Sequence, residues 1–150
     1  MQLIYSGSDL TFLTACLDDI QQRLQGLLRS SRRSTDRQET LRSLSRLESA
    51  KRALAARKDG EFSPTLNDLR VYYIAALAKR DELNRLLDAP GRPAGLQDDL
   101  LACTAACNSI LRVIRANVTQ AGLDLKQFVD SCTGASLAGL PDGPGDAAPL

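Results

Sequence analysis

The chain has 150 residues, with 19 basic and 18 acidic side chains, much Leu and Ala, and three Tyr, three Phe and no Trp. Its length indicates a single domain, and its Leu and Ala content favours helices over sheets. Because it contains no His, it cannot form a Ser-His or Cys-His nucleophile pair or supply an imidazole ligand. We therefore expect a protein that is not an enzyme and that uses no metal or cofactor.

The N-terminal sequence MQLIYSGSD lacks the basic segment and the apolar run of a signal peptide. No apolar run approaches the roughly 18 residues of a membrane-spanning helix. We therefore expect a cytoplasmic protein without a membrane partner, whose Cys residues stay reduced.

A first helix is predicted over residues 8–29. Its apolar residues recur at alternating steps of three and four, which is typical of a helix packed in a bundle or coiled coil: Leu10, Leu13, Leu17, Ile20, Leu24 and Leu27. The polar stretch 30–35 is the expected connection, and Thr35 with Gln38 fits a capping box for a second helix over 35–58. Because this connection contains neither Pro nor Gly, the alternative is one continuous long helix.

The third and fourth helices are predicted over residues 63–88 and 96–121. Ser63 and Pro64 form a typical helix start, and two Pro and two Gly within 88–95 separate the two helices. The fourth helix should bury one face made of Leu96, Leu100, Cys103, Cys107, Ile110, Ile114, Val118 and Ala121.

A short fifth helix is predicted over residues 123–131, after Gly122 ends the fourth. Residues 133–150 are rich in Gly, Pro and Ala and have no periodicity, which predicts a flexible tail. The expected fold is an all-α antiparallel bundle of about four helices with a short fifth, formed by residues 1–132.

Cys103 and Cys107 lie on the apolar face of the fourth helix, four residues apart. A zinc site would need two further ligands, and the chain offers neither a His nor a second Cys pair at similar spacing. We interpret both as small core residues and assign no role to Cys16 or Cys132.

The second helix is predicted to be basic, since residues 29–58 hold ten basic and three acidic residues. Such a stripe can neutralise phosphates, although no aromatic residues are interleaved with it for base stacking. It can equally face an acidic neighbour, a partner protein or water. The stripe consists of Arg32, Arg33, Arg37, Arg42 and Arg46.

Two stretches carry a resemblance to a known family. They are AKRALAARKDGEFSPTLNDLRVYYIAALAKRDELNRLLDAPG (50–91) and DLLACTAACNSILRVIRANVTQ (99–120). Their order of helices and breaks resembles the middle and last helices of flagellar export chaperones, which hold hook-associated proteins before secretion. Asn108 and Leu111 match an asparagine and a following leucine of that family, whereas Ser109 stands where it often has glycine.

The resemblance implies an all-helical bacterial chaperone whose C-terminal helices engage a client protein. The residues expected to contact that client are Asn108, Leu111, Arg112, Arg115, Leu125 and Phe128. The leading hypothesis is a module that binds a protein partner through amphipathic helices. The alternatives are a nucleic-acid-associated protein that uses the basic stripe, and a structural protein that forms homo-oligomers through its first helix.

Overall fold

The computed structural model describes residues 3–4, 7–56, 61–62, 64–91, 93–133, 137 and 140. Within these residues there are five helices: α1 (Gly7–Ser30), α2 (Ser34–Ala55), α3 (Leu66–Asp88), α4 (Ala94–Gln120) and α5 (Leu125–Cys132). Two short strands, β1 (Leu3–Ile4) and β2 (Glu61–Phe62), pair antiparallel, with Leu3 opposite Phe62. The predicted all-α bundle, with four main helices and a short fifth, is confirmed.

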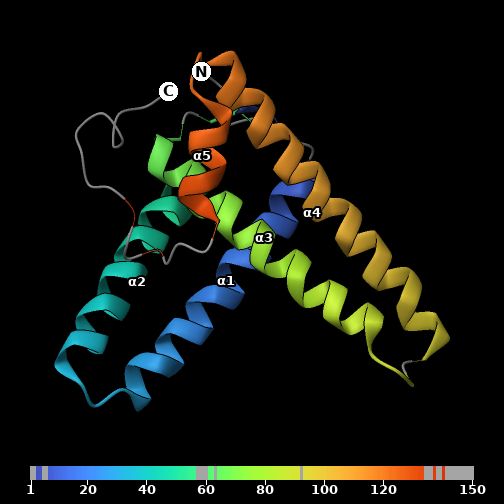
Figure 1. Cartoon of the computed structure of the whole chain (residues 1–150), viewed down its shortest axis with the longest axis horizontal. Helices are drawn as coiled ribbons and strands as arrows, with labels where there is room; N and C mark the ends of the chain where they lie inside the picture. The colour runs from blue at the N-terminus through green and yellow to red at the C-terminus, as the bar shows by residue number, and fades with distance from the viewer. Residues whose placement is uncertain are drawn as a thin grey trace.

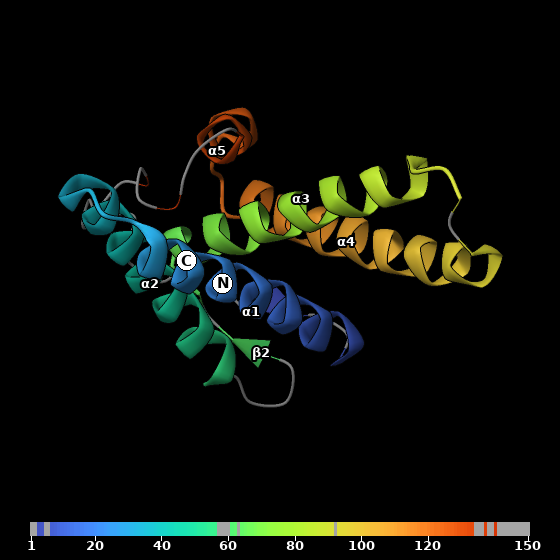
Figure 2. The same ribbon diagram turned by 90° about the horizontal axis from the view of Figure 1, so that it is seen from below.

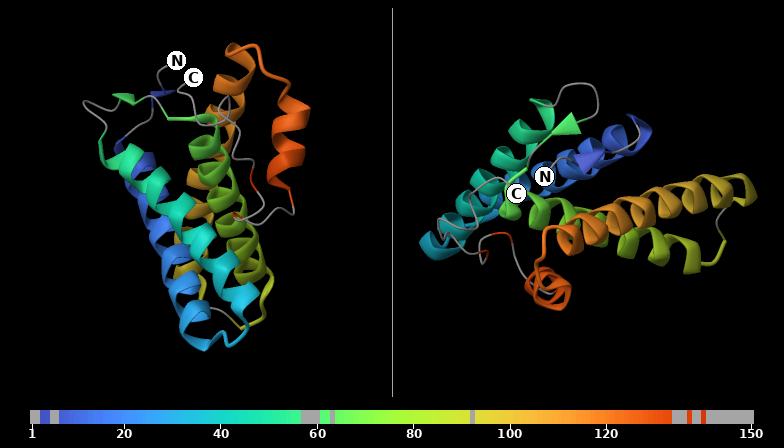
Figure 3. Two further views of the ribbon diagram at one scale, coloured as in Figure 1. Left: turned by 90° about the vertical axis from the view of Figure 1, so that its left-hand side faces the viewer. Right: turned by 90° about the horizontal axis from the view of Figure 1, so that it is seen from above.

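The four long helices form two antiparallel hairpins that diverge. In Figure 1 the α1–α2 hairpin runs to the lower left and the α3–α4 hairpin to the lower right. Figure 2 and the right panel of Figure 3 show the same separation from below and from above. The two interhelical connections therefore lie at opposite sides of the molecule, away from the region where the hairpins meet.

Helix α3 is the central element, because it contacts each of the other four helices. Its residues Leu69, Tyr72 and Ala76 are fully buried. The hydroxyl of Tyr72 donates a hydrogen bond of 2.7 Å to the carbonyl oxygen of Ala50, which fastens α3 to α2. Burial of this apolar face is the main stabilising contribution to the fold.

The first two helices are separate, with residues 31–33 between them. The predicted capping box of Thr35 and Gln38 is wrong, because α2 begins at Ser34 and its N-cap, Arg33, makes no side-chain cap hydrogen bond. The guanidinium of Arg37 instead closes the connection by donating to the carbonyl oxygens of Leu28 (2.7 Å) and Ser31 (3.4 Å).

The start of α3 also differs from the prediction. Its N-cap is Thr65, whose side chain accepts from the backbone N–H of Asp68, while the Asp68 carboxylate accepts from the backbone N–H of Thr65; both distances are 3.1 Å. This reciprocal pair satisfies two otherwise unpaired N–H groups and places the helix start after Pro64. The predicted cap Ser63 lies outside the described residues.

Gly122 follows the end of α4 with a positive φ of 76°, as expected for a residue that ends a helix. Asp124 then caps α5 by accepting from the N–H of Gln127. Within the predicted flexible tail, Leu137 and Leu140 are buried in the core. The carbonyl oxygen of Leu140 accepts a hydrogen bond from Arg46 of α2.

Two leucines that the periodicity places on buried faces are exposed, Leu27 by 56% and Leu96 by 43%, and Leu41 of α2 is exposed by 51%. They lie close to the interhelical connections, where the hairpins have diverged and no other helix covers them. Ala121, at the end of α4, is exposed as well. In the described part of the chain no helix has both the length and the apolar character needed to cross a membrane.

Candidate partner-binding groove

The residues expected to contact a client do not form one surface. Leu111 and Phe128 are only 1% and 4% exposed and belong to the main core. The resemblance to flagellar export chaperones names both as contact residues, but their side chains are used for packing inside this chain. The other four are accessible: Asn108, Arg112 and Arg115 are exposed on α4, and Leu125 is half-buried on α5.

Helix α5 is fastened to the first half of α3. The ring of Phe128 packs against Tyr73, and Cys132 is buried beside it in the same core. The guanidinium of Arg70 donates to the hydroxyl of Ser131 at 3.2 Å, and this hydroxyl donates to the Phe128 carbonyl at 2.6 Å. Because α5 has only eight residues, it depends on these contacts for its helical structure.

A groove of about 510 Å³ lies beside α5, between α3 and the C-terminal half of α4. We call it the α3–α5 groove. Its apolar part is formed by the half-buried side chains of Ile74, Leu77 and Val129. Its charged part is formed by Arg80, Asp81 and Arg115. Its remaining lining residues are Tyr73, Ala78, Cys132 and Thr133.

Only Arg115 of this groove is among the predicted contact residues. The sequence signal for the rest is a second stripe on α3, in which Ile74, Leu77, Ala78 and Asp81 follow each other at steps of three, one and three. Such a stripe lies on one helix face. It is hard to recognise from the sequence because the more strongly apolar core face of α3 lies directly beside it.

A second hollow of about 510 Å³ lies between α1 and α2. The ammonium group of Lys51 and a carboxylate oxygen of Asp18, both from residues that line it, form an ion pair at 2.6 Å. Lys51 also donates to the side chain of Gln21. Because this polar linkage already joins its two walls, the α3–α5 groove is the better candidate for receiving another chain.

Of the predicted basic stripe, Arg37, Arg42 and Arg46 lie on α2, whereas Arg32 and Arg33 lie in the connection before it. Arg37 holds the α1–α2 connection and Arg46 holds Leu140. The residues Arg32, Arg33, Arg37 and Arg42 are exposed, and Arg46 is half-buried. The stripe is therefore partly structural and does not form a continuous basic surface along the helix.

The Cys residues are free thiols within the described chain, and three of them are buried: Cys16, Cys107 and Cys132. Burial raises the pKa of Cys16 to about 12 and the pKa values of Cys107 and Cys132 to about 11. These thiols stay protonated and unreactive at neutral pH. No metal-binding group of His, Cys, Asp or Glu occurs among the described residues.

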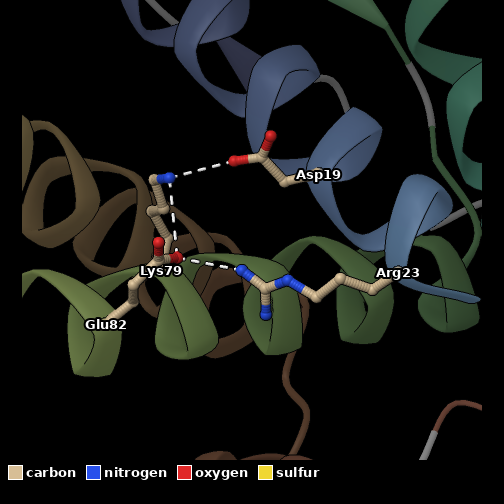
Figure 4. A network of polar contacts seen from close by, with 4 residues as sticks. All are labelled: Asp19, Arg23, Lys79 and Glu82. Carbon is tan, nitrogen blue, oxygen red and sulfur yellow. Dashed lines mark hydrogen bonds and ion pairs between the residues drawn. The ribbon is translucent and has the colours of Figure 1, made fainter. Parts of the chain in front are cut away.

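A four-residue ionic network joins α1 to α3 near the point where the hairpins diverge (Figure 4). Lys79 lies 2.9 Å from Asp19 and 3.6 Å from Glu82, and Glu82 also lies 2.9 Å from Arg23. The hydrogen bond to Asp19 raises the pKa of Lys79 above its ordinary value. The network links α1 to α3, and because its side chains are partly exposed its contribution to stability is small.

No family model, curated protein or solved structure matches the chain. The resemblance to flagellar export chaperones therefore stays a prediction that rests on the two stretches quoted above.

Proposed function

We propose that the protein is a non-enzymatic, cytosolic module that binds an amphipathic helix of a partner protein in the α3–α5 groove. The observation that carries this proposal is the groove itself, with Ile74, Leu77 and Val129 on its apolar part and three charged residues beside them. An amphipathic helix binds such a groove through apolar residues spaced at three and four.

The charges of the groove specify the complementary partner. A partner helix would place carboxylates opposite Arg80 and Arg115 and a basic residue opposite Asp81, beside its apolar stripe. The resemblance to flagellar export chaperones suggests the class of client: a hook-associated protein held before its secretion.

The direct test is a calorimetric titration of the full-length protein with the purified hook-associated proteins of the same organism. A78R places a bulky charged side chain in the groove, and its matched control A105R places the same side chain on the exposed surface of α4. R115E reverses a charge in the groove, and R112E reverses one outside it.

We expect A78R and R115E to weaken binding at least tenfold, which corresponds to about 1.4 kcal/mol, while A105R and R112E bind like the wild type. Equal affinity of A78R and the wild type, with A78R shown to be folded by circular dichroism, would disprove the use of this groove. If no hook-associated protein binds, the flagellar assignment is wrong. The groove proposal is then tested by capturing partner proteins from the source cells with the wild type and with A78R. The proposal requires that A78R fail to retain a partner that the wild type retains.

A further inference from the structure

The end of the α1–α2 hairpin, residues 27–42, is basic and apolar; we call it the basic tip. It contains five Arg and two acidic residues. Leu27 and Leu41 are more than half exposed there. The exposed side chains of Arg29, Arg32 and Arg42 form no ion pair with a described residue.

The end of the α3–α4 hairpin, residues 81–101, has the opposite charge; we call it the acidic tip. It contains five acidic residues and two Arg. Three of these acids, Asp88, Asp98 and Asp99, are exposed and unpaired within the described chain. Three leucines beside them are exposed by 43–48%: Leu86, Leu96 and Leu101.

We infer that the basic tip of one molecule binds the acidic tip of a second copy of this chain. The net charges of the two tips are equal and opposite, +3 and −3. Each tip also carries exposed leucines that no described element of the same chain covers. Contact between two copies would bury both sets of leucines and would pair the unpaired arginines with the unpaired carboxylates.

The shape of the molecule explains why the partner is another copy. The two tips lie at opposite sides of the diverging hairpins (Figures 1 and 3), so they do not meet within one molecule. A two-fold axis between two copies brings each basic tip to the acidic tip of the other. The same contact then forms twice, and the result is a closed dimer.

The test is sedimentation velocity of the full-length protein over a concentration series, at low and high ionic strength. The variant R29E/R32E/R42E reverses charges on the basic tip, and D88K/D98K/D99K reverses charges on the acidic tip. Arg37 is left intact because it holds the connection. The control variants R52E and D130K reverse exposed charges away from both tips. Circular dichroism verifies that every variant is folded.

We expect a wild-type dimer that dissociates as ionic strength rises, because exposed ion pairs are screened by salt. Each triple variant should weaken self-association at least tenfold, whereas R52E and D130K should not. An equimolar mixture of the two triple variants should dimerise again, because the tips that face each other then carry opposite charges.

Three results would overturn the inference. The first is a wild-type protein that is monomeric at all concentrations and at low salt. The second is a dimer that both triple variants preserve. The third is bound nucleic acid that R29E/R32E/R42E releases, with no dimer remaining after nuclease treatment, which would assign the basic tip to nucleic acid instead.

Discussion

The ring of Phe128 meets the ring of Tyr73 edge to face, with centroids 5.5 Å apart and planes inclined by 76°. This contact places α5 against α3 and thereby forms one wall of the α3–α5 groove. Because both side chains are at least 96% buried, the contact combines aromatic geometry with apolar burial.

We expect F128A to lower the free energy of unfolding by about 3 kcal/mol, because it removes a buried aromatic ring and leaves a cavity. Urea denaturation, monitored by circular dichroism, measures this change in the free energy of unfolding. The control K126A truncates an exposed side chain of the same helix and should change stability by less than about 0.5 kcal/mol. A fully stable F128A would mean that α5 contributes nothing to the fold.

Lys79 provides a second prediction, because it pairs with Asp19 of α1 as well as with Glu82 of its own helix. We expect K79M to lower the free energy of unfolding by about 1 kcal/mol at low salt, and by less at high salt. K126M is the control, since Lys126 is exposed and forms no ion pair with a described residue.

A double-mutant cycle of K79M with D19N isolates the Lys79–Asp19 interaction. A coupling energy indistinguishable from zero would contradict the role of this network in joining the hairpins. Because the pKa of Lys79 is raised in the folded state, its contribution is complete below its ordinary pKa of 10.5 and is lost as the pH rises through the folded-state value.

The buried thiols predict loss of stability in alkaline solution. In the unfolded chain they ionise near pH 9, but in the folded protein they ionise at about 11 to 12. The stability that the buried, protonated thiols contribute to the folded protein is therefore complete below pH 9 and is lost as the pH rises toward 11. Each thiol should add a slope of up to about −1.4 kcal/mol per pH unit in this interval.

Denaturation of the wild type and of C16A at a series of pH values tests this prediction. The slope should become shallower in C16A. An unchanged slope would show that Cys16 ionises as readily in the folded protein as in the unfolded chain.

Arg46 gives a fourth prediction, which concerns the segment after α5. Its guanidinium donates to the carbonyl oxygen of Leu140, so R46A should lower stability by about 1 kcal/mol. It should also expose the segment that contains Leu137 and Leu140. We expect faster cleavage there by a protease that cuts beside small and apolar residues, since the stretch 133–150 contains no Lys or Arg.

R42A removes an exposed arginine from the same helix and should be cleaved at the wild-type rate. Equal cleavage rates for R46A and R42A would indicate that the Arg46 contact does not retain the segment.

Much of the fold could be predicted from local sequence signals. Alternating apolar steps located the four long helices within a few residues, and Gly122 marked the end of α4 because its positive φ is unfavourable for other residues. Helix starts were harder. Thr65 and Asp68 form a capping box that the neighbouring Ser63 and Pro64 obscured, since several polar residues in one stretch can all serve as a cap.

The predicted site was less accurate for a different reason. Periodicity identifies the apolar face of a helix but not whether another helix covers it. Leu27 therefore looked buried although it is exposed. Leu111 was named as a contact residue by the resemblance to flagellar export chaperones, and it is buried. Whether another helix covers a given residue depends on packing between segments that are distant in the sequence, which the periodicity of one helix does not report.

The central position of α3 has a consequence for synthesis on the ribosome. The α1–α2 hairpin is complete before residues 66–88 are made, yet its apolar face is covered by α3. We expect Leu13, Leu17 and Leu47, which are at most 1% exposed in the complete fold, to be less buried until α3 has left the exit tunnel. An α1–α2 hairpin without α3 therefore presents apolar surface of the kind that makes partly folded chains prone to aggregation.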